Sequence, residues 1–91
     1  MTKPKFSRES FKQWLQKQPS TTRFKGKKYQ KCPIGKYNMA FGREPWYAID
    51  PHSSTWPWIF VDKLDIKQHI NPKASFSPAQ CLALLKEIPN A

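Results

Sequence analysis

Nine prolines divide this 91-residue chain into short segments, and their spacing limits the fold more than any other sequence feature. A proline inside a helix removes a backbone hydrogen bond and clashes with the preceding turn, so helices tend to end near each one. We therefore expect no long helix and no coiled coil. The length favours one domain. We assign residues 1–6 to a flexible basic tail and residues 7–91 to a single domain.

Helical periodicity is clearest at the two ends of the chain. Near the N-terminus, Ser7 can cap a helix whose apolar stripe is formed by Phe11, Trp14 and Leu15, and Pro19 ends it. Near the C-terminus, Ser77, Pro78 and Gln80 form a capping-box pattern. The apolar stripe that follows there consists of Cys81, Leu84, Leu85 and Ile88.

A third, shorter helix is expected from Cys32 to Phe41. Pro33 suits its first helical position, where the missing N–H costs nothing. Gly42 is a natural C-terminal cap. Gly35 inside this helix indicates that the helix needs tertiary support.

Extended structure is expected between these helices. Thr21–Lys25 could form one strand that turns at Gly26 and returns from Lys27 to Gln30. Residues 46–49 and 56–61 resemble a hairpin around the turn at residues 50–54. Residues 62–70 are open to two interpretations, a helix or a continuing strand. The predicted fold class is α+β, with the N- and C-terminal helices packed on a short antiparallel hairpin or three-stranded sheet and a short helix after Cys32-Pro33.

The positive charge is confined to the first part of the chain. The net charge is +10. Residues 1–36 carry 11 Lys or Arg and one acid, which gives +10, whereas residues 37–91 carry five of each sign, which gives zero. Such asymmetry favours an anionic partner, either nucleic acid or an acidic protein surface. A solubilising charge is the alternative.

Residues 23–37 combine these charges with aromatic rings. Lysine and arginine neutralise phosphates, and rings between them can stack on unpaired bases. The alternative is that the rings fill the core and the lysines surround them. The candidate binding residues are Lys12, Arg23, Lys25, Lys27, Lys28, Tyr29, Lys31, Lys36 and Tyr37.

Three further candidates have structural alternatives. Trp56 and Trp58 flank a proline and could form an exposed aromatic interface or fill the core. Cys32 lies beside Lys31 at an expected helix start, where a thiol pKa falls, so it is a candidate reactive thiol or a packed small residue.

Catalysis and metal binding have little support in the sequence. The set Cys32, His52, His69 and Cys81 lacks the paired spacing typical of zinc sites. Phosphate loops and nucleophile elbows do not occur, so we expect no enzyme, no cofactor, no metal and no small-molecule substrate. No apolar run suits a membrane span or a signal peptide, and two cysteines are too few for a disulfide framework, so we expect a cytoplasmic protein.

One resemblance follows from three short motifs. Phe11, Trp14 and Leu15 form F-x-x-W-L, residues 32–37 form C-P-I-G-K-Y, and residues 46–50 form W-Y-x-I-D. Together they resemble small uncharacterised proteins of cyanobacteria and bacterial phages, in which C-P-[IL]-x-x-Y follows F-x-x-W-L. In this chain Asn38 and Met39 replace the aliphatic residue that follows the tyrosine in those proteins. The resemblance implies no fold, site or activity, only a phage, mobile-element or host-defence context.

The sequence thus predicts a small basic binding protein without enzymatic activity. Lysine predominates among its cations, whereas base readout relies on Arg, Asn and Gln, so we expect contact with the phosphate backbone and little sequence readout. A modulator that binds an acidic protein surface through the basic patch and exposed aromatics is the second hypothesis.

Overall fold

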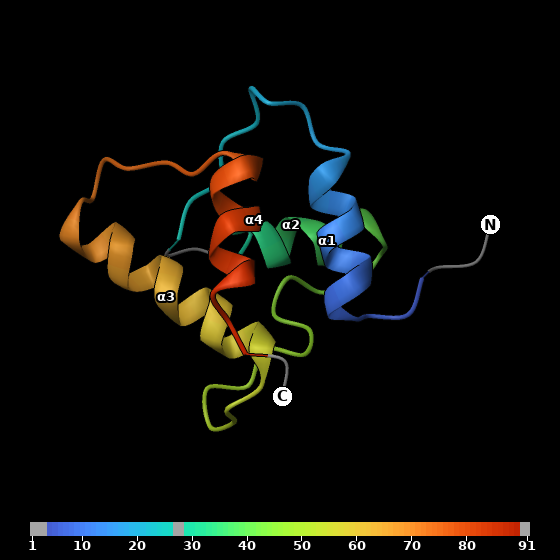
Figure 1. Ribbon diagram of the computed structural model, residues 1–91. Helices are drawn as coiled ribbons and strands as arrows, with labels where there is room; N and C mark the ends of the chain where they lie inside the picture. Colours follow the sequence, from blue (N-terminus) through green and yellow to red (C-terminus); the bar gives the residue numbers. More distant parts are fainter. Residues whose placement is uncertain (1–3, 27–28, 90–91) are drawn as a thin grey trace.

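The computed structural model describes residues 4–26 and 29–89, which form four helices (Figure 1). They are α1 (Arg8–Gln16), α2 (Pro33–Ala40), α3 (Trp56–Ile70) and α4 (Pro78–Lys86). Helix α1 packs against α4 and α2, and the longer α3 runs across one side of this group. Within the described ranges, no helix has the length and apolar character needed to cross a bilayer.

The predicted sheet is wrong. Residues 46–49 form turns, and residues 56–61, expected as the return strand, are the first part of α3. Proline fits this position because Pro57 lies in the first turn of the helix, where its missing N–H costs nothing. The buried face of α3 follows helical spacing through Pro57, Phe60, Val61, Leu64 and Gln68. The same 15-residue helix includes residues 62–70, so of the two interpretations of this segment the helix is correct and the continuing strand is wrong.

The other predicted strand is reduced to one antiparallel bridge. Phe24 and Phe76 exchange two backbone hydrogen bonds, of 2.8 and 2.9 Å. The fold class is therefore all-helical within the described part of the chain, and not α+β. The return strand predicted from Lys27 to Gln30 lies partly outside the described residues.

The three helices predicted from local signals are confirmed. Ser7 caps α1 by accepting a hydrogen bond from the Ser10 N–H at 3.0 Å. Both hydrogen bonds of the capping box between Ser77 and Gln80 are present at the start of α4. At the end of α2, Gly42 takes a φ of 74°, the left-handed conformation that suits glycine after a helix.

An aromatic core joins the helices. The Phe11 ring meets Phe60 edge-on at 5.3 Å and Tyr37 edge-on at 5.5 Å, which links α1 to α3 and α2.

The Arg8 guanidinium on α1 donates to the backbone carbonyls of Leu85, Ile88 and Pro89 at the end of α4. This contact satisfies carbonyls that a helix end leaves without intrahelical partners.

The N-terminal segment from Pro4 to Phe6 is held against the domain. Arg43 donates a hydrogen bond to the Pro4 carbonyl. The Phe6 ring stacks on Trp56 at 5.5 Å and contacts Tyr37 and Tyr47. The expected flexible tail therefore does not extend to residues 4–6, and residues 1–3 lie outside the described part.

Gly35 marks the closest approach between α2 and the chain before it. A Cβ atom placed on Gly35 would lie 1.5 Å from the Tyr29 carbonyl oxygen, and that oxygen belongs to the backbone. The residue is therefore glycine for a steric reason, although glycine weakens a helix by up to about 1 kcal/mol relative to alanine.

We expect Gly35→Ala to destabilise the protein by about 1–3 kcal/mol, because the added methyl group must displace the backbone near Tyr29. In an open helical position the same change would be stabilising. Urea unfolding followed by circular dichroism measures the difference, with Met39→Ala at an exposed position of the same helix as the control. A Gly35→Ala protein as stable as the wild type would contradict this packing.

Candidate nucleic-acid interface

A backbone hydrogen bond brings together two of the predicted lysines, Lys25 and Lys31, and closes the chain between them into a loop. The Lys25 N–H donates to the Lys31 carbonyl at 2.9 Å, so the chain leaves and returns at the same point. We call residues 25–31 the basic loop. Lys27 and Lys28 belong to it by sequence and lie outside the described residues. Among the described residues, this hydrogen bond holds Lys25 and Lys31 beside each other at the two ends of the loop.

One anchor of the basic loop is the buried side chain of Gln68 on α3. Its Oε1 accepts a hydrogen bond from the Gly26 N–H at 2.9 Å. Its Nε2 donates to the carbonyls of Asn71, Pro72 and Ala74 at 3.2, 2.9 and 2.8 Å. A single amide thus joins the loop to the turn after α3.

The position of Gly26 against α3 leaves no room for a side chain. A Cβ atom at this position would lie 2.5 Å from the Leu64 carbonyl oxygen, so the backbone can rest directly on α3. The second anchor is Tyr29, whose carbonyl lies against Gly35 and accepts a weak hydrogen bond from the Cys32 thiol at 3.5 Å. The loop is therefore fixed to α3 at one end and to α2 at the other.

The turn after α3 adds a cation that the sequence did not indicate. The Lys25 Nζ donates to the Ala74 carbonyl at 2.9 Å, which places this turn beside the loop. Lys73 is exposed in the same turn. Lys31 is also exposed. Lys73 was missed because it belongs to the half of the chain whose charges sum to zero, and only the long-range contact brings it here.

The rings of the predicted segment separate into two groups. Tyr29 is 36% exposed, whereas Phe24 and Tyr37 are 0% exposed. Tyr37 donates from its hydroxyl to Ser10 Oγ at 2.7 Å and packs on Phe11. Tyr37 is thus a core residue whose ring is not accessible to a ligand, whereas Tyr29 is accessible at the surface.

The remaining predicted cations lie apart from the basic loop. Arg23 is exposed and its guanidinium donates to the carbonyls of Ser20 and Thr22 in its own turn. Lys36 is half-buried on α2. Lys12 lines a groove between α1 and α4.

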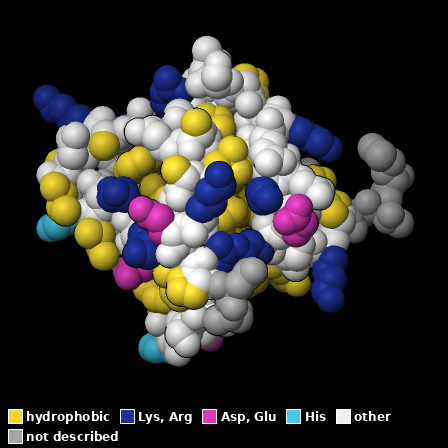
Figure 2. Space-filling model, viewed as in Figure 1, with side chains coloured by type: hydrophobic (Ala, Val, Ile, Leu, Met, Phe, Trp, Pro, Cys, Tyr) yellow, Lys and Arg dark blue, Asp and Glu magenta, His cyan; other side chains and the backbone are white. Residues whose placement is uncertain are grey.

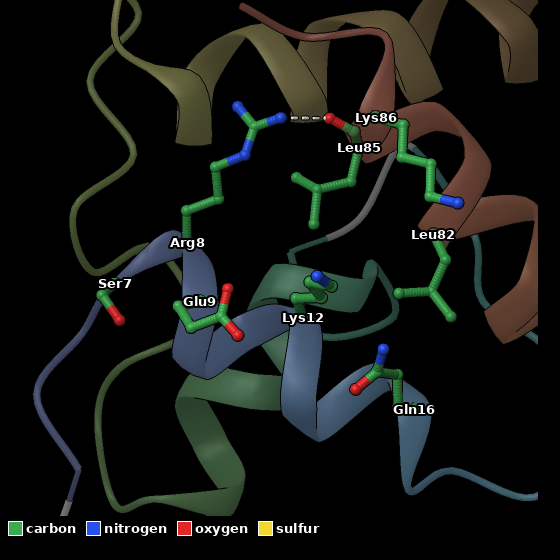
Figure 3. A pocket seen from close by; sticks show the side chains of 8 residues that line it. All are labelled: Ser7, Arg8, Glu9, Lys12, Gln16, Leu82, Leu85 and Lys86. Atoms are coloured by element: carbon green, nitrogen blue, oxygen red, sulfur yellow. Dashed lines mark hydrogen bonds between the residues drawn. The ribbon is translucent and has the colours of Figure 1, made fainter. Parts of the chain in front are cut away.

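This groove has a volume of about 540 Å³ and is also cationic (Figure 3). Leu82 and Leu85 line it from α4, and Lys12 extends into it from α1. Arg8 at its end is already engaged with α4 carbonyls, and Glu9 is part of its lining. Figure 2 accordingly shows Lys and Arg side chains over the middle of this face with acidic side chains among them. The residues that line the groove carry three positive charges and one negative charge, whereas residues 25–31 contain four lysines and no acid in the sequence.

In the described part of the chain, the most exposed Trp and Tyr rings are those of Trp46 and Tyr47, and not those of the predicted interface residues Trp56 and Trp58. Trp56 and Trp58 are partly buried and pack against the core, and Trp56 stacks on Phe6 and Phe11. Trp46 and Tyr47, in the connection between α2 and α3, are 52% and 49% exposed. The hairpin predicted from residues 46–49 and 56–61 assigns Trp46 and Tyr47 to a strand, so the sequence did not indicate that these two rings are exposed in a connection.

Cys32 has the opposite character to a reactive thiol. Burial raises its pKa from the ordinary value of 9.0 to about 11, and the hydrogen bond from the Gly35 N–H only partly offsets this effect. Burial, and after it the Cys32 charge, raises the pKa of Cys81 to about 12. Cys32 acts as the cap of α2. In the part of the chain that is described, no three His, Cys, Asp or Glu side chains come together to hold a metal ion.

The fold and this loop define a small helical domain with a closed, lysine-rich loop on its surface. Comparisons of the chain with protein-family models, curated proteins and solved structures found no match. A function is therefore inferred below from the chemistry of the surface.

We expect Gln68→Leu to destabilise the protein by about 1–3 kcal/mol, because the buried Gly26 N–H loses its acceptor and the carbonyls of Asn71 and Pro72 lose a donor. Urea unfolding gives the change, and hydrogen exchange at the Gly26 amide should accelerate. The matched control is Gln13→Leu, the same substitution at an exposed position of α1. Equal stability of the two variants would show that Gln68 does not anchor the loop.

We expect neither cysteine to react with iodoacetamide in the folded protein at pH 8, whereas both react rapidly in urea. Because their folded pKa values are raised, the folded state retains protons that the unfolded state loses, so stability falls as the pH rises above about 9. Mass spectrometry counts the alkylated thiols. Rapid modification of Cys32 without denaturant would contradict this expectation and show that Cys32 is a reactive thiol.

Proposed function

We propose that this protein binds nucleic acid without catalysis, by placing the lysines of the basic loop against the phosphate backbone. The observation that carries the proposal is the closure of this loop by the hydrogen bond between Lys25 and Lys31 and its anchoring on Gln68. These contacts hold Lys25 and Lys31 close together, and the contact between Lys25 and Ala74 brings the turn that carries Lys73 beside them.

The charge distribution supports an anionic ligand. The net charge of +10 is contributed by the first 36 residues, and the loop lies inside that segment. Exposed Lys31 and Lys73 can approach a phosphate from two segments that the Lys25–Ala74 contact brings together. Phosphate neutralisation releases counterions, and this supplies affinity that does not depend on sequence.

The composition of the site favours backbone contact over base readout. The cations of the loop are lysines, which act as flexible point charges, whereas bidentate recognition of guanine relies mainly on arginine. Arg23 uses part of its guanidinium within its own turn. The absence of catalysis is proposed because Cys32, the thiol considered as a nucleophile, is buried with a raised pKa.

A cytoplasmic location is part of the proposal. Both cysteines are free thiols, a state that a reducing compartment maintains. Nucleic acid is also accessible there.

We expect measurable binding to oligonucleotides at about 50 mM salt and a steep loss of affinity as salt rises, because each phosphate contact releases counterions. Lys31→Gln combined with Lys73→Gln should weaken binding and reduce the salt slope by about 2, one for each lost contact. Fluorescence anisotropy of labelled oligonucleotides measures both quantities.

The matched control is Lys12→Gln combined with Lys86→Gln, which removes the same charge from the groove between α1 and α4. The control should reduce the slope much less. If the groove variant has the larger effect, the site is misassigned. If the wild type binds no oligonucleotide at 50 mM salt and instead co-purifies with an acidic protein, the proposal fails in favour of a protein partner.

A further inference from the structure

A second exposed element follows α2, at the opposite end of this helix from the basic loop. We call residues 43–49, between α2 and α3, the aromatic loop. It carries Trp46 and Tyr47, which are 52% and 49% exposed. Large exposed rings are uncommon on a domain whose other tryptophans pack against the core, so these two require an explanation.

The aromatic loop has a defined conformation. The buried Asn38 side chain donates from Nδ2 to the carbonyls of Pro45 and Tyr47, both at 3.1 Å. Two successive turns follow, in which the Tyr47 N–H donates to Glu44 and the Ile49 N–H donates to Trp46. The rings are therefore presented by a fixed backbone, which limits the conformational entropy that a ligand contact would cost.

Maintaining this loop has a free-energy cost. Ala48 adopts a φ of 62°, a left-handed conformation unfavourable for a residue with a Cβ atom. Beside it, the Oδ1 atom of Asn38 and one terminal nitrogen of Arg43 are buried without a hydrogen-bond partner within the described structure. Backbone strain and unpaired buried groups concentrate at functional sites more often than in purely structural connections.

Positive charge is present in the aromatic loop itself. The Arg43 guanidinium lies 5.5 Å from the centre of the Tyr47 ring and also contacts the rings of Phe6 and Tyr37. Arg43 therefore holds Tyr47 from one side by a cation–π contact while Trp46 has no such partner among the described residues. Exposed Glu44 balances the charge of Arg43 within this loop, so the loop supplies the ring for an unpaired base while Lys31 and Lys36 supply the positive charge for its phosphates.

Helix α2 connects the two loops. The basic loop contacts its first turn through Tyr29, Cys32 and Gly35, and the aromatic loop returns to it at Asn38. An eight-residue helix is about 12 Å long. Lys36 lies on α2 between the loops, with Met39 and Ala40 exposed on the same helix.

We infer that the ligand is single-stranded nucleic acid, which follows α2 with its phosphates near Lys31 and Lys36 and with bases stacked on Tyr29 and Trp46. Bases in a duplex are already stacked on their neighbours and offer no free face to these rings. The inference rests on the proposed function and adds the class of nucleic acid and the residues that select it.

The test compares a fluorescein-labelled dT12 oligonucleotide with a 12-base-pair duplex at equal salt. We expect the wild-type protein to bind the single strand at least about 10-fold more tightly, since stacking adds to charge neutralisation. Trp46→Ala should weaken binding to dT12 by about 10-fold and leave duplex binding unchanged. Tryptophan fluorescence should be quenched by dT12 in the wild type and much less in Trp46→Phe, because Trp46 supplies most of that signal.

The matched control is Ile66→Ala, which truncates a side chain with the same exposed fraction of 52% on α3. If Trp46→Ala does not fold, Trp46→Leu keeps an apolar side chain and removes the aromatic face. Equal affinity for dT12 and duplex, or dT12 binding unchanged in the Trp46 variants, overturns the inference while phosphate binding by the basic loop still stands. Loss of all oligonucleotide binding at low salt overturns the proposed function as well.

Discussion

The buried amide of Gln68 is the contact on which the surface described here depends. Helix α1 is packed against α4 and α2, but the described residues between α1 and α2 and between α3 and α4 form no helix and share only one isolated bridge. Gln68 uses its oxygen for Gly26 in one connection and its nitrogen for three carbonyls in the other. A buried side chain with all of these contacts replaces the ladder of hydrogen bonds that a sheet would have provided.

This arrangement also explains how a small domain tolerates concentrated charge. Lysines of one sign repel one another, and an unanchored loop would relax by spreading them apart. Here Gly26 rests on the Leu64 carbonyl and Tyr29 rests on Gly35, and both contacts need a glycine. Two positions without side chains therefore fix the backbone of the loop, while the exposed side chain of Lys31 stays available to a ligand. The free-energy cost of the charge repulsion is offset by these two backbone contacts, in which the charged groups take no part.

The sequence predicted the parts of the fold that are decided locally. Caps and apolar stripes at Ser7, Cys32 and Ser77 depend on neighbours within one or two turns, and each of the three helices begins where these residues indicate. The error lies in residues 56–61, where alternating rings suggested a strand. Pro57 is compatible with an edge strand or a first helical turn, and only burial through Phe60, Leu64 and Gln68 decides in favour of the helix. The pairing of Phe24 with Phe76 spans most of the chain and has no local signal.

The candidate site was predictable in composition but not in geometry. The lysines before α2 are evident in the sequence, yet Lys73 joins them only through the contact between Lys25 and Ala74. The rings were harder to assign, because exposure of an aromatic residue depends on what packs over it. Trp56 is covered by Phe6, which the contact between Arg43 and Pro4 holds in place, whereas Trp46 projects from a turn that Asn38 fixes from the inside. The same N-terminal segment that covers one tryptophan also contacts Tyr47, so the exposure of the aromatic loop is set by residues more than 30 positions away. Sequence separation of this size explains why the pattern of rings alone could not identify which tryptophan faces a ligand.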